Sequence, residues 1–399
     1  MNSILQAAIG LAATLRQISD EVCVRHIGRA DVVRATLLSL ISKRPAFFLG
    51  TPGVDKTGTV QDLAKRIEGA VCYDVLMPTI TSPEQLLIES TSIKETPTAD
   101  GGREISTKDK LGRAALAHLL FADEIWKADD RVLQTALDLS KGDGVRHEGQ
   151  LVKTPLLAFL SASNELPDPE GKLGAMWSRQ TIRVRVDSLD KAGKLRMIKS
   201  RFASVASVSS AKLTLADIEM LRTARKLVVI PQEIIEIVLQ IYQELLDEDS
   251  AGFQWAWDDD RRFGRVFDVL QASALIAGRG VVNKADLTCL EWLLWDTPEQ
   301  IATVAAKVRP YCRTALMDAR EQLDALMAAG GLVALTVGGD RGKGVKALQQ
   351  IEACETEISR LKGTADTSEI SQFDTLTTEV AKAKADVIAV VTGQRKGGV

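Results

Sequence analysis

The stretch Phe47-Phe48-Leu49-Gly50-Thr51-Pro52-Gly53-Val54-Asp55-Lys56-Thr57 decides the fold of this chain. The apolar run 46–49 predicts a buried strand, and after the Gly/Pro turn the apolar residues take up helical spacing. A strand, a tight glycine loop and a helix N-terminus bind polyphosphates well, because free backbone N–H groups and the helix dipole favour negative charge. Lys56 would reach the β- and γ-phosphates, and the Thr57 hydroxyl would hold Mg²⁺. The stretch therefore predicts a nucleotide site, with contacts from Gly50, Pro52, Gly53, Val54, Asp55, Lys56 and Thr57.

Asp55 departs from the phosphate-loop pattern G-x-x-x-x-G-K-[ST], which has glycine before the lysine. A carboxylate ~5 Å from phosphate oxygens would cost on the order of 3 kcal/mol at an effective dielectric constant of ~20. Mg²⁺, Lys56 and the helix dipole would offset part of this cost, or the side chain points outward. Aspartate is also a good N-cap for a helix that begins at Lys56. A strand, turn and helix without any ligand is the alternative interpretation.

The composition is that of an ordinary globular protein. The 399 residues are 45% hydrophobic and 26% charged with a net charge of −3, which suits two or three domains and argues against an obligate, non-specific nucleic-acid binder. Five scattered cysteines, none in C-x-x-C spacing, favour reduced thiols in a cytosol. No apolar run approaches ~20 residues, and the apolar start at 4–15 lacks the basic region of a signal peptide. We expect a cytoplasmic protein without a membrane span.

An α/β core is expected over residues 1–188. Five strands are predicted over 46–49, 71–77, 119–122, 155–161 and 182–186, and the apolar runs 46–49 and 119–122 are expected to be buried. Helical segments separate these runs, and strands spaced by helices predict a parallel sheet. Residues 91–111 form a polar excursion with little periodicity, whereas 145–152 have the character of a hairpin.

No strand pattern appears after Ser188. Helical periodicity predicts an all-α lid over residues 189–305, with helices that include 284–295. The last domain, 306–399, would be a three-helix bundle built from one long exiting helix and a helical hairpin, namely 298–328, 345–362 and 368–391.

Acidic residues end the third predicted strand at Asp123 and Glu124. Beside the phosphate loop, Asp123 would coordinate Mg²⁺ and Glu124 would polarise the attacking water. Asn164, at the tip of the fourth strand, could hydrogen-bond that water or the γ-phosphate. The alternatives are an apolar strand simply ended by carboxylates and an Asx-turn at Asn164. The acidic pair becomes a specific signal of a nucleotide site only in combination with the phosphate loop.

Two sets of arginines are candidates for contacting the nucleotide. Arg179 lies in a turn before the last strand, too far along the sheet to serve its own phosphate, and suits a neighbouring subunit's γ-phosphate as an arginine finger. Arg183 competes for this role, and a solvated surface arginine is the alternative. Arg261 and Arg262 begin a lid helix and could reach back to the nucleotide, although a charged helix face explains one of the two.

The chain resembles the MoxR branch of AAA+ ATPases, most closely RavA-type proteins, over about residues 20–305. The family often carries alanine before the Walker lysine, so glycine is not required there, but Asp55 remains a departure. The family's usual acidic residue before the finger is replaced by Ser178 here. The resemblance rests on separated motifs, namely the phosphate loop 50–57, Leu120-Phe121-Ala122-Asp123-Glu124-Ile125-Trp126-Lys127-Ala128, Ser161-Ala162-Ser163-Asn164-Glu165-Leu166-Pro167, Leu173 to Arg179, Asp260-Arg261-Arg262, Leu270-Gln271-Ala272-Ser273-Ala274 and Gly278-Arg279.

The resemblance implies roles that composition and spacing do not supply. It implies ATP and Mg²⁺ as cofactors, a homo-hexameric ring, a von Willebrand factor A domain partner and a protein client to be remodelled. RavA-like proteins interrupt their three-helix domain with a β-rich insert; only residues 330–344 stand at that place here, so the RavA client is not carried over. The implied site residues are Lys56 and Thr57 for Walker A, Asp123 and Glu124 for Walker B, Asn164 for sensor 1, Arg179 for the finger, Arg261 or Arg262 for sensor 2, and Ile27 and Gly28 beside the adenine.

The sequence thus predicts an AAA+ P-loop core with an all-α lid and a C-terminal helical bundle, acting as an ATP-hydrolysing remodeller. A nucleotide-binding assembly scaffold with weak hydrolysis is the alternative, and Asp55 motivates it. A DNA-dependent AAA+ machine has less support, because no helix–turn–helix or strongly basic segment appears.

Overall fold

A computed structural model describes residues 2–97, 103–141, 144–147, 150–167, 173–202, 211–248, 260–327, 341–363 and 370–391. The chain divides into two compact units, Met1–Val308 and Arg309–Val399. No helix in the described ranges is both long and apolar enough to cross a membrane.

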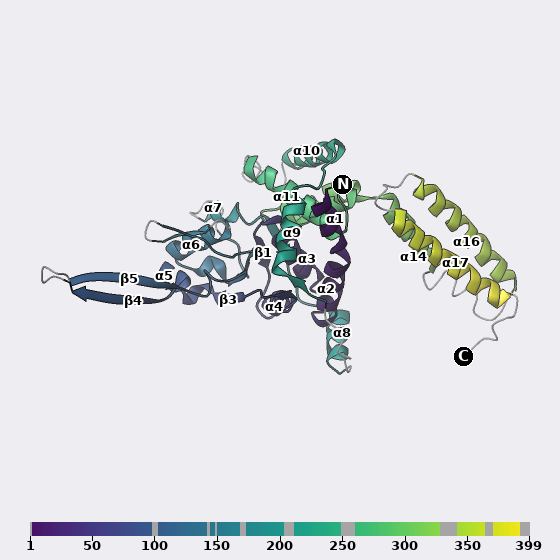
Figure 1. The fold of residues 1–399 in the computed structure, drawn as a ribbon. Coiled ribbons are helices and arrows are strands. Elements are labelled where there is room, and N and C mark those ends of the chain that lie inside the picture. The colour runs from purple at the N-terminus through teal and green to yellow at the C-terminus, as the bar shows by residue number, and fades with distance from the viewer. Residues whose placement is uncertain are drawn as a thin grey trace. The chain divides into compact units, whose positions relative to one another are not determined.

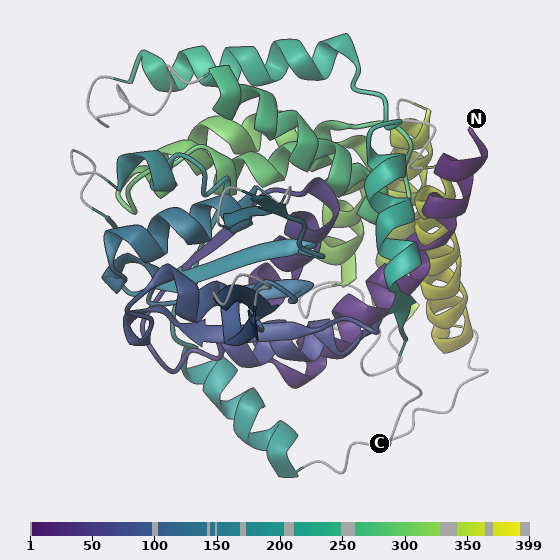
Figure 2. The same ribbon diagram turned by 60° about the vertical axis from the view of Figure 1, so that its left-hand side comes forward.

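A five-stranded parallel sheet forms the centre of the first unit (Figure 2). Its strands lie in the order β10-β1-β9-β6-β3, and each neighbouring pair is parallel. Because all five run the same way, their carboxyl ends share one edge, which is where ligands bind in open α/β sheets. The predicted parallel sheet is confirmed, with bounds β1 (Ala46–Leu49), β3 (Cys72–Leu76), β6 (Leu119–Asp123), β9 (Ala158–Ser163) and β10 (Ile182–Arg185).

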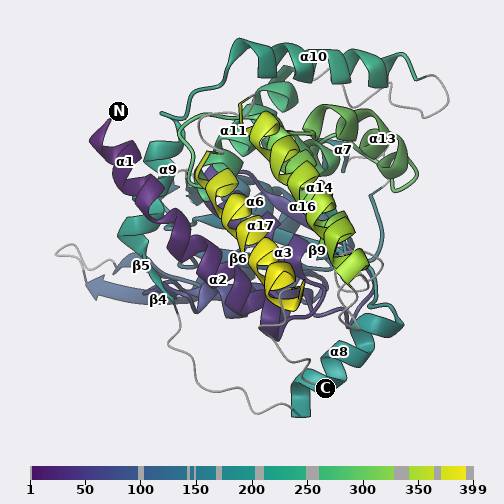
Figure 3. The ribbon, with the colours of Figure 1, turned by 90° about the vertical axis from the view of Figure 1, so that its right-hand side faces the viewer.

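The N-terminal segment forms two helices that follow each other (Figure 3). The break is at Leu11, and the second helix continues to Arg25. α3 is buried along most of its length, since it packs beside the sheet and against the lid helices α9 (Leu215–Arg225) and α11 (Asp260–Ile276). The helices of this region are α1 (Ser3–Gly10), α2 (Ala12–Arg25), α3 (Ala30–Ser42), α4 (Lys56–Ala64), α5 (Pro83–Leu87), α6 (Asp130–Ser140) and α7 (Gly174–Trp177).

The expectation of an irregular polar excursion at 91–111 is wrong. β4 (Ile88–Pro97) and β5 (Arg103–Leu111) pair as an antiparallel hairpin that extends away from the sheet (Figure 1). The polar composition makes these strands hard to predict from the sequence, because neither is a run of apolar residues. A second hairpin, β7 (Val145–His147) with β8 (Gln150–Val152), confirms the prediction for 145–152.

The rest of the first unit is mainly helical, as expected for a lid. The predicted helix at 284–295 is instead a 3₁₀ helix, η4, followed by one α-helical turn. A two-residue parallel ladder between β2 (Ile67–Glu68) and β11 (Leu213–Thr214) interrupts the region predicted to lack strands. The helices are α8 (Lys191–Phe202), α9 (Leu215–Arg225), α10 (Gln232–Leu246), α11 (Asp260–Ile276), η4 (Lys284–Cys289), α12 (Leu290–Leu293) and α13 (Gln300–Cys312).

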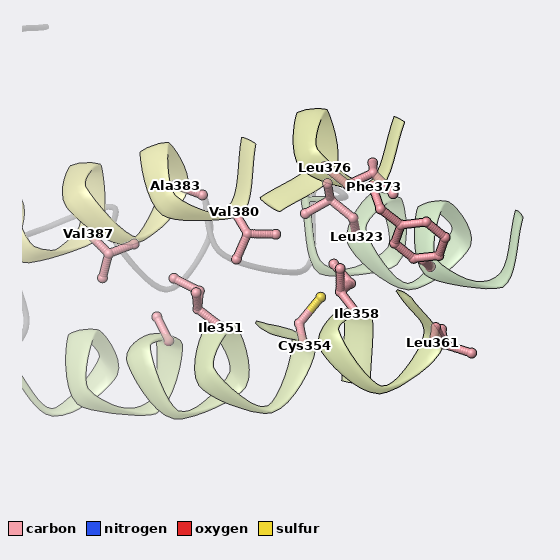
Figure 4. Packing of buried hydrophobic residues seen from close by; sticks show 12 residues of the cluster. Leu323, Ile351, Cys354, Ile358, Leu361, Phe373, Leu376, Val380, Ala383 and Val387 are labelled. Atoms are coloured by element: carbon pink, nitrogen blue, oxygen red, sulfur yellow. The ribbon is translucent and has the colours of Figure 1, made fainter. Parts of the chain in front are cut away.

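The second unit contains α14 (Ala315–Met327), α16 (Arg341–Lys362) and α17 (Ile370–Val391). Its core joins all three helices, with Leu323, Ile351 and Phe373 among the buried side chains (Figure 4). The prediction of one helix over 298–328 is wrong, because helix α13 ends at Cys312 and a separate helix, α14, begins at Ala315. Pro310 removes a helical N–H shortly before the break, and the Thr314 hydroxyl accepts from the Met317 N–H at 3.3 Å, which caps the new helix.

Candidate nucleotide-binding site

The phosphate loop joins the carboxyl end of β1 to the N-terminus of α4, as predicted. Gly50 passes so close to the last strand that a Cβ there would lie 2.3 Å from the Val186 carbonyl oxygen. Gly53 has φ of +82°, a conformation that L side chains rarely adopt. The first N–H groups of α4 have no partners within the helix, so they are available to an anion at the loop.

Lys56 directs its ammonium group back into the loop. Its Nζ donates to the carbonyls of Gly50 at 2.6 Å and Thr51 at 3.2 Å, and the residue is only 8% exposed. Burial lowers the pKa of Lys56 below its ordinary value, while the carboxylates of Asp123 and Glu124 act in the opposite direction. A partly desolvated cation held by carbonyls alone is well placed to take a phosphate oxygen as a further partner.

The two predicted carboxylates lie beside this loop at the end of β6. Asp123 Oδ1 accepts from the Glu124 N–H at 3.0 Å, and Glu124 adopts the left-handed conformation with φ of 50°. Lys127 Nζ lies 2.9 Å from Glu124 Oε2. A pocket of about 240 Å³ is lined by residues 52–58, Asp123 and Glu124 together, so the fold brings the two motifs to one place.

These residues fit a nucleotide bound with a divalent cation. The N-terminus of α4 and Lys56 suit a polyphosphate, and the oxygens of Thr57 and Asp123 are the donor type that Mg²⁺ takes in such sites. Both residues line the same pocket. The individual roles of Thr57, Asp123 and Glu124 remain predictions.

Asp55 does not act as the expected N-cap. Its side chain makes no capping hydrogen bond, and its backbone is left-handed with φ of 61°, which costs about 1–2 kcal/mol for most residues and is tolerated best by Asn and Asp. Its Oδ2 instead lies 2.6 Å from Nδ1 of His26. Sequence reasoning missed His26, because no spacing rule connects it to a loop far along the chain.

Ile27 and Gly28, predicted to lie beside the adenine, follow His26 directly. Gly28 has φ of +72°, and a Cβ there would lie 2.3 Å from Leu189 Cδ2. The buried Arg29 side chain donates to the carbonyls of Gly28 at 2.8 Å and Asp187 at 3.1 Å. These contacts tie the 26–29 loop to the segment after β10, and contact with the adenine stays a prediction.

Asn164 lies just after β9, exposed, at the carboxyl edge of the sheet. The preceding residue, Ser163, accepts from the Gly50 N–H at 3.0 Å, so this strand tip adjoins the start of the phosphate loop. Asn164 also lines a second pocket of about 560 Å³ with Arg185 and Glu299. Its position is consistent with a sensor, but the role is a prediction.

Arg179 is half-buried in the turn that follows α7, and its role as a finger remains a prediction. Arg183 is excluded from that role, because its side chain is completely buried. It forms an ion pair with Asp296, donates to the carbonyls of Trp177 at 3.0 Å and Gln180 at 2.8 Å, and stacks over the Trp177 ring. It therefore positions the turn that carries Arg179 and cannot reach a neighbouring subunit.

Arg262, one of the two candidates for sensor 2, places its guanidinium on Asp296 as well. Its Nη1 lies 3.0 Å from Asp296 Oδ1, and its Nη2 donates to the Leu293 carbonyl at 3.1 Å. The side chain of Arg261, the other candidate, lies outside the described residues. Arg183, Arg262 and Asp296 together form what we call the arginine cluster, and the assignment of sensor 2 remains a prediction.

Comparison with known families agrees with this geometry. Residues 13–223 match the model described as the MoxR domain in the MoxR-vWA-beta-propeller ternary systems. The chain belongs to the MoxR family of AAA+ ATPases. Residues 233–308 match an AAA lid domain. The closer likeness to RavA-type proteins stays a prediction.

Several individual proteins are similar to this MoxR chain. Uncharacterized protein MJ0812 of Methanocaldococcus jannaschii is 26% identical over 324 residues, which cover 78% of this chain and 80% of that protein. Structural protein ORF618 of Acidianus two-tailed virus is 29% identical over 159 residues, 39% of this chain and 25% of that protein. A crystal structure of a proposed ATPase from Cytophaga hutchinsonii has a TM-score of 0.59 at 16% identity, covering 75% of this chain and 96% of that one. At this identity, the structural likeness shows the shared fold alone.

Proposed function

We propose that this MoxR-family protein binds ATP with Mg²⁺ at the phosphate loop and hydrolyses it. The observation that supports this most directly is the single pocket lined by residues 52–58, Asp123 and Glu124. It combines a loop suited to phosphates with the two carboxylates that hydrolysis needs. Membership of an ATPase family supports the same conclusion.

Four residues of the pocket have a proposed task. Lys56 would exchange a loop carbonyl for a phosphate oxygen, and Thr57 with Asp123 would hold the metal, which supplies charge neutralisation at the phosphates when bound. Glu124 would accept a proton from the attacking water. Lys127, 2.9 Å from Glu124, orients that carboxylate.

We further propose that the protein works as a homo-hexameric ring in the cytoplasm and remodels a protein client. The matched family model is described from systems that contain vWA proteins, which supports a von Willebrand factor A domain partner. Arg179, on its half-buried turn, would then contact the γ-phosphate held by a neighbouring subunit. The alternative is an assembly scaffold that binds nucleotide and hydrolyses it weakly, which the aspartate at position 55 favours.

ATP turnover by the purified full chain separates these functions. Glu124→Gln should lower turnover at least about 100-fold, because a general base contributes about 10²–10⁴-fold. Glu68→Gln is a matched control, since it makes the same chemical change at an exposed position on β2 and should turn over ATP like the wild type. Wild-type turnover no faster than that of Glu124→Gln would contradict hydrolysis and favour the scaffold.

Mixed assemblies test the role of Arg179. Arg179→Ala subunits mixed with Glu124→Gln subunits should recover activity, because a Glu124→Gln neighbour can still supply Arg179 to an intact Glu124 site. Mass photometry with ATP would show whether rings form. Only monomers under these conditions, or no recovery in the mixture, would contradict an arginine shared between subunits.

A further inference from the structure

The nucleotide site contains a polar contact that its proposed function does not use. His26 lies between the two ends of one face of α4, since Asp55 precedes the helix and Asp62 lies two turns further on. Nδ1 of His26 is 2.6 Å from Asp55 Oδ2, and Nε2 is 3.4 Å from Asp62 Oδ2. We call these three residues the His26 clasp.

The clasp accounts for where the Asp55 carboxylate lies. Oδ2 is bound to His26, and Oδ1 lies against the first turn of α4, so that a Cβ on Gly58 would be 2.3 Å from it. One oxygen is thus bonded to His26, and the other lies close to Gly58. Glycine at position 58 is what leaves room for this placement.

The clasp is held in place from the other side as well. The His26 side chain is 16% exposed and that of Asp62 14% exposed, so the pair is largely shielded from water. Arg25 Nη1 lies 3.3 Å from Asp62 Oδ1, and the buried Arg66 has its Nε 4.0 Å from the same oxygen. Since Asp62 is anchored by two arginines, the imidazole ring has a fixed point from which to hold Asp55.

We propose that His26 is a positioning residue for nucleotide binding, which keeps the Asp55 carboxylate off the phosphate oxygens. This inference rests on the proposed nucleotide site. A carboxylate beside the Walker lysine repels a polyphosphate when it is free to turn toward it. Held by His26, it is kept from turning toward the phosphates, so the loop keeps its affinity although glycine is absent at position 55. The same contact links the phosphate loop to the 26–29 loop, where the adenine is expected.

A double-mutant cycle on the full chain tests this inference. The readout is the dissociation constant of a fluorescent, slowly hydrolysed ATP analogue with Mg²⁺, measured for the wild type, His26→Ala, Asp55→Gly and the double variant. His26→Ala should bind about tenfold more weakly, because residues in contact commonly couple by such amounts. Asp55→Gly should bind within about twofold of the wild type, and the double variant should bind like Asp55→Gly.

The rescue by Asp55→Gly is the decisive feature, since a histidine that merely supported the fold would still be missing from the double variant. Equal weakening in His26→Ala and the double variant, or no weakening in His26→Ala, would overturn the clasp. His26→Gln, which keeps one side-chain donor, serves if the alanine variant does not fold and should weaken binding less than tenfold. A wild type that binds no nucleotide would overturn the proposed function itself, a result distinct from wild-type binding without coupling.

Discussion

Two groups of charged side chains in the first unit are built in opposite ways. In the phosphate loop, Lys56 contacts backbone carbonyls, and the Asp55 side chain is 52% exposed. In the arginine cluster, the side chains of Arg183 and Asp296 are 0% and 1% exposed, and two guanidinium groups share one carboxylate. Lys56 makes two hydrogen bonds and keeps a third donor for a ligand, whereas the charged groups of the cluster use their bonding capacity within the chain.

The difference appears in how burial acts on the charges. Burial and the nearby Arg262 lower the pKa of Arg183 to about 9, although Asp296 acts against this shift. Burial alone would raise the pKa of Asp296, but the two arginines lower it below its ordinary value. The cluster is therefore stable only as a complete set, and it connects β10 to the lid through the Trp295 carbonyl as well. The phosphate loop is under no such constraint.

Removing the shared carboxylate should have the largest effect on stability. Asp296→Ala leaves two buried guanidinium groups without their counter-ion, and breaking a buried ion pair in this way costs about 3–5 kcal/mol. Chemical denaturation of the full chain, followed by tryptophan fluorescence, would report the loss, because Trp177 and Trp295 contact Arg183 of the cluster. Asp187→Ala is the matched control, since Asp187 pairs with Arg185 at an exposed site and should cost less than about 1 kcal/mol. Similar losses of unfolding free energy in both variants would show that the arginine cluster is no more important for stability than an exposed ion pair.

The sequence predicts the sheet well, because its central strands β1 and β6 are short apolar runs of the kind that a doubly covered parallel sheet buries. The β4–β5 hairpin is different, since polar residues on both strands carry no burial pattern. An Asp-Gly-Gly turn signal at 100–102, flanked by Ile and Thr, could have revealed it. The break at 313–314 could also have been predicted, from Pro310 and a threonine that caps the next helix.

The site shows a similar limit. The motifs correctly predict that Lys56 and Asp123 lie near each other, because both follow strands of one parallel sheet, whose carboxyl ends share an edge. The motifs do not predict that the Arg183 side chain is buried, because the burial depends on Asp296, which lies far along the chain. The contact between His26 and Asp55 depends on the same kind of long-range placement.

The second prediction concerns the phosphate loop. Lys56→Ala should change the free energy of unfolding without nucleotide by less than about 1 kcal/mol, because the cost of burying the ammonium group offsets its two hydrogen bonds to carbonyls. It should abolish the stabilisation that Mg·ATP gives the wild type, about 2.7 kcal/mol at a ligand concentration 100 times the dissociation constant. Thermal unfolding with and without nucleotide measures both quantities. A large loss without nucleotide would mean that Lys56 is structural, like the arginine cluster.

The smallest expected effect is a weakening of nucleotide binding at alkaline pH. Burial lowers the pKa of Lys56 below 10.5, so the free protein loses this proton at a lower pH than an exposed lysine does. Because phosphate binds the ammonium form, affinity should be constant well below the lowered pKa and should fall as the pH rises through it, by less than about tenfold up to pH 10. Titrations with ADP between pH 7 and 10 measure this fall, and circular dichroism at each pH checks that the fold persists. Lys65→Ala removes an exposed amine outside the pocket and should leave the profile unchanged, whereas a flat wild-type profile, or one abolished in Lys65→Ala, would show that Lys56 does not set it.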